Sequence, residues 1–467
     1  MKKILKPQIP NDSLFFENLK VVEDVFAFVM GKISVEGKNS KERIYRDPVH
    51  NIIRIRTDEK IGELLVHLID TAEFQRLRRI KQLGLAMFTY QGAEHSRFTH
   101  SLGVLHLINR VLEKLSSKYT IKGEDQSVIK CAALLHDIGH GAFSHVFEKI
   151  LNFHHEDFTI ETISSEETEI GRALKSFSSD FPERVASVIR GKFNSVALSQ
   201  LVSSQLDVDR MDYLLRDSLM TGAKYGVYDL EWIIRTLEID ESRDRIYVAT
   251  EGLHAVEGYL QARYYMFKQV YFHRNLRSAE VVLQSLLKRA IELIKNNGDV
   301  WFAKDTPFEK ILKQQKLSLK EHLEMDDSDV IFHVKKWQSA EDKVLSDLSK
   351  RFINRRLFSA LDLDMPEDEK KSFLEEARRV VEDGGFDPQY YFIEDKASDV
   401  PYYLYKADEK EPKSLILVQV GHSRPQIKEI SEVSPAVESL KKAYELHRIC
   451  FPSELKEKIL RLYKKKT

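Results

Sequence analysis

A long stretch of helical periodicity is the feature that most limits what this chain can fold into. From about residue 43 to about residue 300, apolar side chains recur every three or four residues, which places them along one face of a helix. The clearest segments are residues 72–83, 128–135, 206–219 and 255–294. Persuasive strands in the same stretch are short, at residues 52–55 and 246–249. The pattern predicts a mainly α fold built on a helical core.

The sequence changes character after about residue 350, where β-like runs alternate with helical ones. The predicted strands are residues 357–361, 390–393, 402–405 and 415–420. The predicted helices are residues 367–382, 435–448 and 452–464. We therefore predict three regions, namely a peripheral N-terminal segment (1–42), a helical core (43–350) and a smaller α+β C-terminal region (351–467) that serves assembly or allosteric control.

Length, charge and composition indicate a chain of several domains and exclude some classes of partner. A chain of 467 residues is too long for one ordinary hydrophobic core, so more than one domain is expected. Its net charge of −1 gives no overall attraction to nucleic acid or anionic membranes, and no apolar run is long enough to cross a bilayer. Cys131 lies in an apolar run and is expected to be a buried thiol, which suits a reducing compartment. We expect a cytoplasmic protein without membrane or nucleic-acid partners.

Histidine is unevenly placed along the chain. Eight of the 16 histidines lie between residues 95 and 155. They are His95, His100, His106, His136, His140, His145, His154 and His155. Core and surface histidines would be scattered more evenly, so the clustering favours a functional site.

The pair His136-Asp137 directly follows the apolar helix 128–135 and is itself followed by glycines. A helix stopped by glycine is a rigid platform from which two adjacent side chains can converge on one ion. Taken alone, the pair is explained at least as well by a histidine at a helix C-terminus beside a surface aspartate. His140 and His145 follow in the same segment of small residues, which is poor core packing and favours a site.

A second segment places His100 in the first turn of another helix, just after Arg97. Taken alone, Thr99 or Ser101 would cap that helix, and His100 would be an exposed residue of its first turn. This segment indicates a functional site only when it is considered together with the His136-Asp137 segment and a third segment that follows.

A third segment presents polar side chains along one face of a helix, inside the most apolar part of the chain. At 100° per residue, the stripe consists of Asp209, Arg210, Tyr213 and Asp217. A solvated amphipathic helix would give a similar pattern, but the apolar surroundings argue against it.

Together the three segments supply two imidazoles and two carboxylates, from His100, His136, Asp137 and Asp209. A mixed nitrogen and oxygen ligand set suits a divalent ion such as Mg, Mn, Fe, Zn or Ni. Such an ion polarises phosphoryl oxygens, and the neighbouring basic residues are suited to holding phosphate. The pattern predicts one metal site of the H…HD…D type.

These segments belong to an ordered set that extends beyond the metal motif. Its members are residues 47–50, 74–84, 97–104, 136–145, 155–156 and 207–217. The set resembles the HD superfamily of metal-dependent phosphohydrolases and, within it, the dNTP triphosphohydrolases, the group that contains the sterile-alpha-motif/HD-domain enzyme and its bacterial relatives. The match is strong over residues 43–280 and weaker across the C-terminal region. The resemblance implies that region 43–350 is an HD-type phosphohydrolase core.

The resemblance also implies a role for each matched residue. The metal ligands would be His100, His136, Asp137 and Asp209. The general acid would be His155, with His140, His145 and Glu148 as orienting neighbours. The triphosphate would be held by Arg97, Arg210 and Arg263. The sugar 3′-hydroxyl would be recognised by Gln82, Tyr213 and Asp217, while Leu83 and Tyr271 would pack against the ribose and crowd a 2′-hydroxyl.

Two positions depart from the family pattern. Arg210 stands where a lysine is common, which keeps the charge but changes its geometry. Phe267 stands where the family carries a further histidine, so one contact to base or phosphate is in doubt.

Some members of the family are tetramers in which guanine nucleotides bind between subunits. The matching residues here are Arg43, Asp70, Gln75, Arg78 and Arg355. An ordinary group of surface ion pairs is the alternative explanation. A second activator pocket is poorly matched, because Ala249, Glu251 and Ala255 occupy its positions.

We therefore predict a metal-dependent enzyme that cleaves a dNTP to deoxynucleoside and triphosphate, activated by GTP or dGTP within a homotetramer. Water activated by the metal would attack the α-phosphorus while His155 protonates the leaving 5′ oxygen. Two alternatives stay open. The chain could be another HD phosphohydrolase, such as a nucleotidase or a single-strand nuclease, or a catalytically silent nucleotide-binding scaffold.

Overall fold

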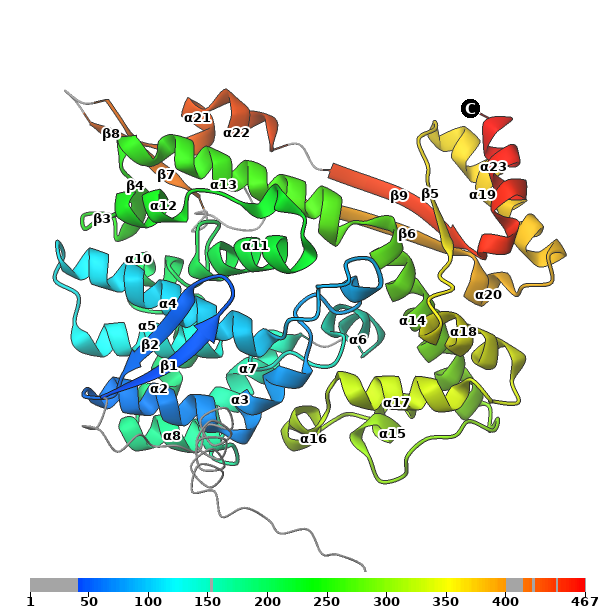
Figure 1. The fold of residues 1–467 in the computed structure, drawn as a ribbon, viewed down its shortest axis with the longest axis horizontal. Coiled ribbons are helices and arrows are strands. Elements are labelled where there is room, and N and C mark those ends of the chain that lie inside the picture. Colours follow the sequence, from blue (N-terminus) through cyan, green and yellow to red (C-terminus); the bar gives the residue numbers. More distant parts are fainter. Residues whose placement is uncertain (1–40, 152–153, 400–414, 422–424, 442–443, 467) are drawn as a thin grey trace, which may run out of the picture.

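The computed structural model describes residues 41–151, 154–399, 415–421, 425–441 and 444–466. The predicted N-terminal segment 1–42 lies almost wholly outside these residues, as does the predicted strand 402–405. Helices dominate the described chain, and its strands form small sheets (Figure 1). The predicted fold class, mainly α with a smaller α+β C-terminal part, is confirmed.

A β-hairpin of β1 (Glu42–Asp47) and β2 (Asn51–Arg56) opens the described chain. Asp47 closes its turn by accepting two backbone N–H groups, at 2.9 and 2.8 Å. Asn51 adopts a left-handed φ of 61°, which asparagine tolerates better than most residues. The turn thereby fixes His50, whose ring reaches the functional site.

The helical core packs mainly around one hydrophobic cluster. Its elements are α2 (Lys60–Asp70), α3 (Ala72–Arg76), η1 (Leu77–Arg79), η2 (Ala86–Phe88), α4 (Arg97–Ser116), α5 (Gly123–Leu135), α6 (Ser144–Leu151), α7 (His155–Ser164), α8 (Glu169–Phe177), α9 (Phe181–Ile189), α10 (Val196–Gln200), α11 (Val208–Thr221), η3 (Lys224–Gly226), α12 (Leu230–Thr236), η4 (Thr250–Gly252) and α13 (Leu253–Met266). Helices α4 and α5 are buried along most of their lengths. Gly103 lets α11 approach α4 closely, because a Cβ there would lie 1.9 Å from Asp212 Oδ1. This close packing sets the polar face of α11 against the start of α4.

A π-helical turn, η5 (Phe267–Tyr271), separates α13 from the long helix α14 (Arg274–Lys295). Helix α14 contributes to a second hydrophobic cluster, which it shares with the C-terminal elements. The remaining helices are α15 (Pro307–Leu312), α16 (Leu319–Glu324), α17 (Asp327–Trp337), α18 (Lys343–Ile353), α19 (Glu367–Asp383), α20 (Pro388–Tyr391), α21 (Ile430–Val433), α22 (Pro435–Ser439), η6 (Ser453–Leu455) and α23 (Lys456–Lys464).

Two further sheets join segments that are far apart in the sequence. One contains β3 (Leu237–Asp240), β4 (Arg245–Val248), β7 (Leu417–Val420) and β8 (Gln426–Glu429) in that order, with β7 parallel to β4. The other contains β5 (Ser359–Asp362), β9 (Tyr444–Phe451) and β6 (Ile393–Asp399), antiparallel throughout. The long strands β6 and β9 lie side by side, and β6 packs against α14 (Figure 1). The predicted division at residues 350 and 351 stays a prediction.

Three predictions of secondary structure were wrong in part. The predicted strand 390–393 is the end of α20 and the start of β6, because Asp387 caps a short helix that proline opens. The predicted helix 435–448 gives way to β9, whose pairing with two other strands outweighs the local helical pattern. The predicted helix 72–83 ends where Ile80 becomes extended, just before the chain forms a bridge to the start of α4.

Other predicted elements are confirmed to within a few residues. They are residues 52–55, 128–135, 206–219, 246–249, 357–361, 367–382, 415–420 and 452–464. The predicted helix 255–294 is confirmed apart from its interruption at η5. Cys131 is a buried free thiol, as predicted, and burial raises its pKa.

Candidate active site

Four potential ligands from three elements meet at one point of the helical core. His100 projects from the first turn of α4, His136 and Asp137 follow the end of α5, and Asp209 lies in the first turn of α11. The Nε2 atom of His100 lies 3.0 Å from Asp209 Oδ1, 3.3 Å from His136 Nε2 and 3.8 Å from Asp137 Oδ2. The Nε2 atom of His136 lies 3.4 Å from Asp137 Oδ1 and 3.6 Å from Asp209 Oδ1. The structure brings together all four residues that the sequence singled out.

This donor set fits a divalent cation. The two imidazole rings are nearly perpendicular, at 80°, with their Nε2 atoms facing each other, so that both lone pairs can reach one ion. Burial alone would lower the pKa of His100, but hydrogen bonds to Asp209 and Asp212 raise it to about 10. Burial would raise the pKa of Asp137, but the charges of Arg97 and His136 hold it well below its usual range. A cation would take the place of the imidazole proton and balance the same carboxylates.

A buried network holds His100 in this orientation. Its Nδ1 atom lies 2.8 Å from Asp212 Oδ2, and the other oxygen of Asp212 lies 2.7 Å from His50 Nε2. Arg216 donates to Asp212 at 2.8 and 2.9 Å and to Asp47 at 2.7 Å. Carboxylate–histidine contacts of this kind fix the tautomer and the ring orientation of a metal-binding imidazole.

Sequence reasoning assigned no role to this supporting network, although two signals were present. Asp212 follows Asp209 by three residues, a spacing that places both on one side of a helix. Asp47 and His50 lie in one of the segments that matched the family pattern. Only the fold shows that the hairpin turn and α11 meet.

A second pair of histidines stands beside the first but is arranged differently. The rings of His140 and His155 stack at 3.7 Å with 15° between their planes. Glu148 Oε1 lies 2.8 Å from His155 Nδ1, and His140 Nε2 lies 3.2 Å from Asp137 Oδ1. The in-plane lone pairs of parallel stacked rings do not converge, so this group is better suited to moving a proton than to sharing an ion. The side chain of His145 lies outside the described residues.

The loop that carries these residues is clamped from distant parts of the chain. The fully buried guanidinium of Arg76 donates to the carbonyl oxygen of His140 at 2.7 Å. His322, in α16, lies 2.7 Å from the Gly139 carbonyl oxygen. Asp327, the first residue of α17, accepts the Phe143 backbone N–H at 3.0 Å. Residues roughly 180 positions apart therefore set the loop's shape, and no spacing in the sequence pointed to them.

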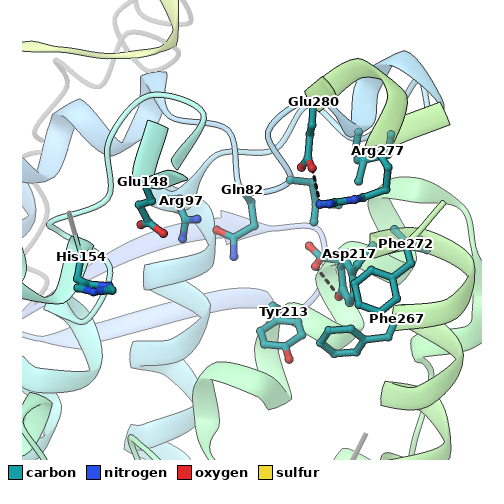
Figure 2. A pocket seen from close by; sticks show the side chains of 15 residues that line it. Gln82, Arg97, Glu148, His154, Tyr213, Asp217, Phe267, Phe272, Arg277 and Glu280 are labelled. Carbon is teal, nitrogen blue, oxygen red and sulfur yellow. Dashed lines mark hydrogen bonds and ion pairs between the residues drawn. The ribbon is translucent and has the colours of Figure 1, made fainter. Parts of the chain in front are cut away.

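A cavity of about 680 Å³, within the size range of small-molecule sites, lies next to these residues. Its lining includes Arg97, which donates to Asp137, and Glu148, which contacts His155. Its lining residues are Gln82, Leu83, Ala86, Arg97, Glu148, His154, Tyr213, Asp217, Phe267, Val270, Tyr271, Phe272, Leu276, Arg277 and Glu280. Figure 2 shows Arg97, Glu148 and His154 at one end and the phenylalanines with Arg277 at the other. Seven of the predicted catalytic and substrate-binding residues line this cavity, namely Gln82, Leu83, Arg97, Glu148, Tyr213, Asp217 and Tyr271.

Several buried polar atoms at this site have no hydrogen-bond partner among the described residues. They include Gln82 Oε1, Arg97 Nε, Arg210 Nε and Arg263 Nε, each from a residue predicted to contact substrate. Arg210 is otherwise held by Asp207 and the Ser204 carbonyl oxygen. Buried polar atoms are rarely left without partners, so this concentration indicates that a polar ligand completes the site.

Aromatic and acidic side chains form the cavity's middle. The Tyr271 hydroxyl donates to Asp217 Oδ2 at 2.8 Å, and His95 Nε2 lies 2.8 Å from Asp217 Oδ1. Tyr213 packs edge-on against Tyr271 at 6.2 Å, and burial raises the pKa of Tyr213 to about 12, so that its hydroxyl keeps its proton. His95 was noted only as part of the histidine cluster; its buried contact with Asp217 is a finding of the structure.

Comparison with known proteins shows similarity to HD-domain proteins and to a phosphohydrolase. The HD-domain family model matches residues 97–217. An uncharacterized protein of Bacillus subtilis, YwfO, is 41% identical over 90% of this chain and 94% of its own length. The deoxynucleoside triphosphate triphosphohydrolase SAMHD1 homolog of Dictyostelium discoideum is 30% identical over 55% of this chain and 51% of its own length. The crystal structure of a phosphohydrolase from Bacteroides thetaiotaomicron superimposes with a TM-score of 0.71 at 28% identity, covering 88% of this chain and 99% of that chain.

The chain belongs to the HD-domain family, among relatives of the dNTP triphosphohydrolases. Membership makes it a metal-dependent phosphohydrolase, and His100, His136 and Asp137 form a group whose ligand atoms lie close enough together to hold a metal ion. The match to the Dictyostelium relative spans about half of that protein. None of the helices in the described part of the chain has the length and apolar character that a membrane crossing requires.

The predicted activator residues of this HD-domain protein fall into two places. Arg43 lies 3.4 Å from Asp70, and Arg78 donates to Gln75 at 2.8 Å. The half-buried Tyr45, which sequence reasoning did not single out, lies among them: burial raises the pKa of Tyr45, and the charges of Arg43, Asp70 and Arg78 act on it. Arg355, by contrast, donates to the carbonyl oxygen of Phe88 in η2. Within one chain, four of the five predicted residues therefore form a group around Tyr45.

Proposed function

We propose that this HD-domain protein is a metal-dependent dNTP triphosphohydrolase, which cleaves a dNTP to deoxynucleoside and triphosphate. One observation carries the proposal. Three buried arginine Nε atoms, those of Arg97, Arg210 and Arg263, lack partners among the described residues, and Arg97 both lines the cavity and donates to Asp137 of the ligand cluster at 2.6 Å. Arginine is the side chain best suited to hold phosphate oxygens in a fixed geometry. The activity in the name of the Dictyostelium relative agrees with this assignment.

Each part of the site has a task in this reaction. A divalent cation bound by His100, His136, Asp137 and Asp209 supplies Lewis-acid chemistry and an activated water. Arg97, Arg210 and Arg263 hold the triphosphate and neutralise charge that develops on it. His155, oriented by Glu148 at 2.8 Å, protonates the leaving 5′ oxygen, with the stacked ring of His140 beside it.

The middle of the cavity accounts for a preference for deoxyribose. Gln82, Tyr213 and Asp217 bind the 3′-hydroxyl, and Leu83 and Tyr271 pack against the sugar where a 2′-hydroxyl would be crowded. Asp217 is held by His95 and Tyr271, so its carboxylate cannot turn away to make room. A wall held rigidly in this way rejects an added oxygen more strongly than a mobile one.

Regulation forms a further part of the proposal. A guanine nucleotide, GTP or dGTP, binds at a subunit interface near Arg43, Asp70, Gln75 and Arg78, with Arg355 as a phosphate contact. The assembly is a homotetramer that acts in the cytoplasm. The C-terminal region 351–467 serves this assembly and its allosteric control.

Product analysis tests the activity directly. Purified protein is incubated with each dNTP and each of Mg, Mn, Fe, Zn and Ni, with and without GTP or dGTP, and the products are resolved by chromatography. Deoxynucleoside with triphosphate is the expected pair, and Asp209→Ala should abolish its formation. Monophosphate with pyrophosphate, or no turnover under any condition, would falsify the proposal. Turnover of monophosphates or single-stranded oligonucleotides would instead favour the nucleotidase or nuclease alternative, and dNTP binding without turnover would favour a scaffold.

A further inference from the structure

The end of the cavity opposite His154 and Glu148 carries a charged pair that the proposed reaction does not use (Figure 2). Arg277 and Glu280 lie one turn apart on α14 and both line the cavity. Arg277 Nη1 donates to Glu280 Oε2 at 2.6 Å. In Figure 2 this pair lies across the cavity from Arg97, Glu148 and His154, with Gln82 between the two ends. A nucleotide whose phosphates occupy the first end would therefore direct its base toward the second.

The pair is held rigidly by the C-terminal sheet. Arg277 also contacts Asp395 of β6 through two nitrogens, with Nε 3.1 Å from Asp395 Oδ2. Arg448 of β9 donates to the carbonyl oxygen of Phe272, a neighbouring lining residue, at 3.0 Å. Asp395 and Arg448 are both buried. A side chain fixed in this way discriminates between ligands better than a mobile one, because little ordering entropy is lost on binding.

Apolar rings adjoin the charged pair. Phe267 and Phe272 both line the cavity, with ring centroids 5.8 Å apart and planes at 69°. Aromatic faces bind nucleobases by stacking without strong preference among them. Any base selectivity must therefore come from the polar pair. The presence of Phe267 in place of the family's histidine makes this end more apolar.

The chemistry of the pair favours one base. A carboxylate is an acceptor only and can take two hydrogen bonds side by side, and among the four DNA bases only guanine presents two adjacent donors, at N1 and N2. Arginine is the preferred partner of guanine O6 and N7. The structure records hydrogen bonds from Nε, Nη1 and Nη2 of Arg277 within the described residues, and the guanidinium has five N–H donors, so donors remain for a base.

We infer that Arg277 and Glu280 form a base-recognition subsite that selects guanine among deoxynucleoside triphosphates, an inference that rests on the proposed function. Glu280 accepts from guanine N1 and N2, and Arg277 donates to O6. Asp395 is a positioning residue, which holds Arg277 in the cavity wall.

Competition between two substrates in one tube tests this subsite. dGTP and dITP differ by the 2-amino group alone, and both experience the same activation state when they are mixed. The relative rates of their consumption by the metal-loaded protein give the ratio of their kcat/KM values. We expect a ratio of about ten in favour of dGTP, the size of one lost hydrogen bond to a charged group. Glu280→Gln should bring the ratio close to one.

A matched control and a second readout complete the experiment. Glu292→Gln changes a carboxylate on the same helix that contacts Gln389 and Tyr390 instead of the cavity, and it should leave the ratio unchanged. Asp395→Asn should lower the ratio less than Glu280→Gln does. Calorimetric titration of dGTP and dITP into the full chain and into Glu280→Gln gives the ratio of affinities even if no hydrolysis occurs, and the difference between the two proteins belongs to the cavity, because the proposed activator site is the same in both. Failure of the proposed reaction is thus distinguished from failure of the subsite.

Three results would overturn the inference. They are equal use and equal binding of dGTP and dITP by the unaltered protein, a ratio that Glu280→Gln does not change, and a preference for dATP, dCTP or dTTP over dGTP in the same competition. The first and third require no variant, so they hold even if a substitution disturbs folding.

Discussion

Two histidine pairs, His100 with His136 and His140 with His155, both lie next to Asp137 but differ in how their rings are oriented. His100 and His136 face each other nearly at right angles, with carboxylates around their Nε2 atoms. His140 and His155 lie flat against each other at 3.7 Å. The first arrangement directs lone pairs to one point, whereas the second does not.

The difference teaches that residue type alone does not decide what a histidine cluster does. Both groups contain two imidazoles with a nearby carboxylate, and both have ligand atoms close enough to suit a metal ion. Ring orientation separates them, and it is set by the supporting contacts, Asp212 for the first pair and Glu148 for the second. We therefore expect the first pair to control metal content and the second to control chemistry at constant metal content.

Removal of a metal ligand should have the largest effect. Asp209→Ala takes away the carboxylate that contacts both His100 and His136, so the bound metal and the activity should be lost together. We expect a decrease of roughly a thousandfold or more in turnover. Metal analysis by mass spectrometry beside the product assay checks both. Full metal occupancy in this variant would contradict the assignment of the first pair.

Removal of the proposed general acid should lower activity without loss of metal. His155→Gln keeps the size of a polar side chain but cannot deliver a proton at neutral pH, and we expect turnover to fall by about 10²–10³-fold. Metal content should equal that of the unaltered protein. A fall in metal content to that of Asp209→Ala would show that the two pairs are not functionally distinct.

A smaller effect is expected from the support behind the first pair. Asp212→Asn leaves all four ligands in place but weakens the contacts that orient His100, and metal affinity should fall by about 10–100-fold. Titration of metal-depleted protein measures this. Asp125→Asn is the matched control, because Asp125 pairs with Arg184 near the surface, away from the site. Equal affinities for both variants would remove Asp212 from the proposed network.

The smallest effect on function is expected at the clamp beneath the second pair, where titration changes stability instead of turnover or metal binding. Burial raises the pKa of Asp327 to about 6 from 3.8, so its contribution to stability is fully present below about pH 4 and is lost as pH rises through 6. Relative to Asp327→Asn, the free energy of unfolding should fall by about 2 kcal/mol between pH 4 and pH 7. Urea denaturation at several pH values measures the difference. If the free energy of unfolding changes with pH equally in the unaltered protein and in Asp327→Asn, titration of Asp327 does not contribute to stability.

Much of the site was accessible from the sequence because its residues lie in short, ordered segments. Helical periodicity placed α4, α5 and α11, and their polar interruptions identified His100, His136, Asp137 and Asp209. The chemistry of that ligand set predicted a divalent metal. The predicted helix 435–448 overlaps the C-terminal strand β9, because a strand's partners lie far away in the sequence and leave no local pattern to predict it from.

Residue types and spacing thus determined the helical class of the fold and predicted which side chains would bind the metal and which would hold phosphate. Only the tertiary structure decided how those side chains are aimed. Asp212, Arg76 and Asp327 orient the site through buried contacts with residues that are distant in sequence. Such contacts depend on the packing of whole helices, and packing is a property of the folded chain that no local pattern encodes.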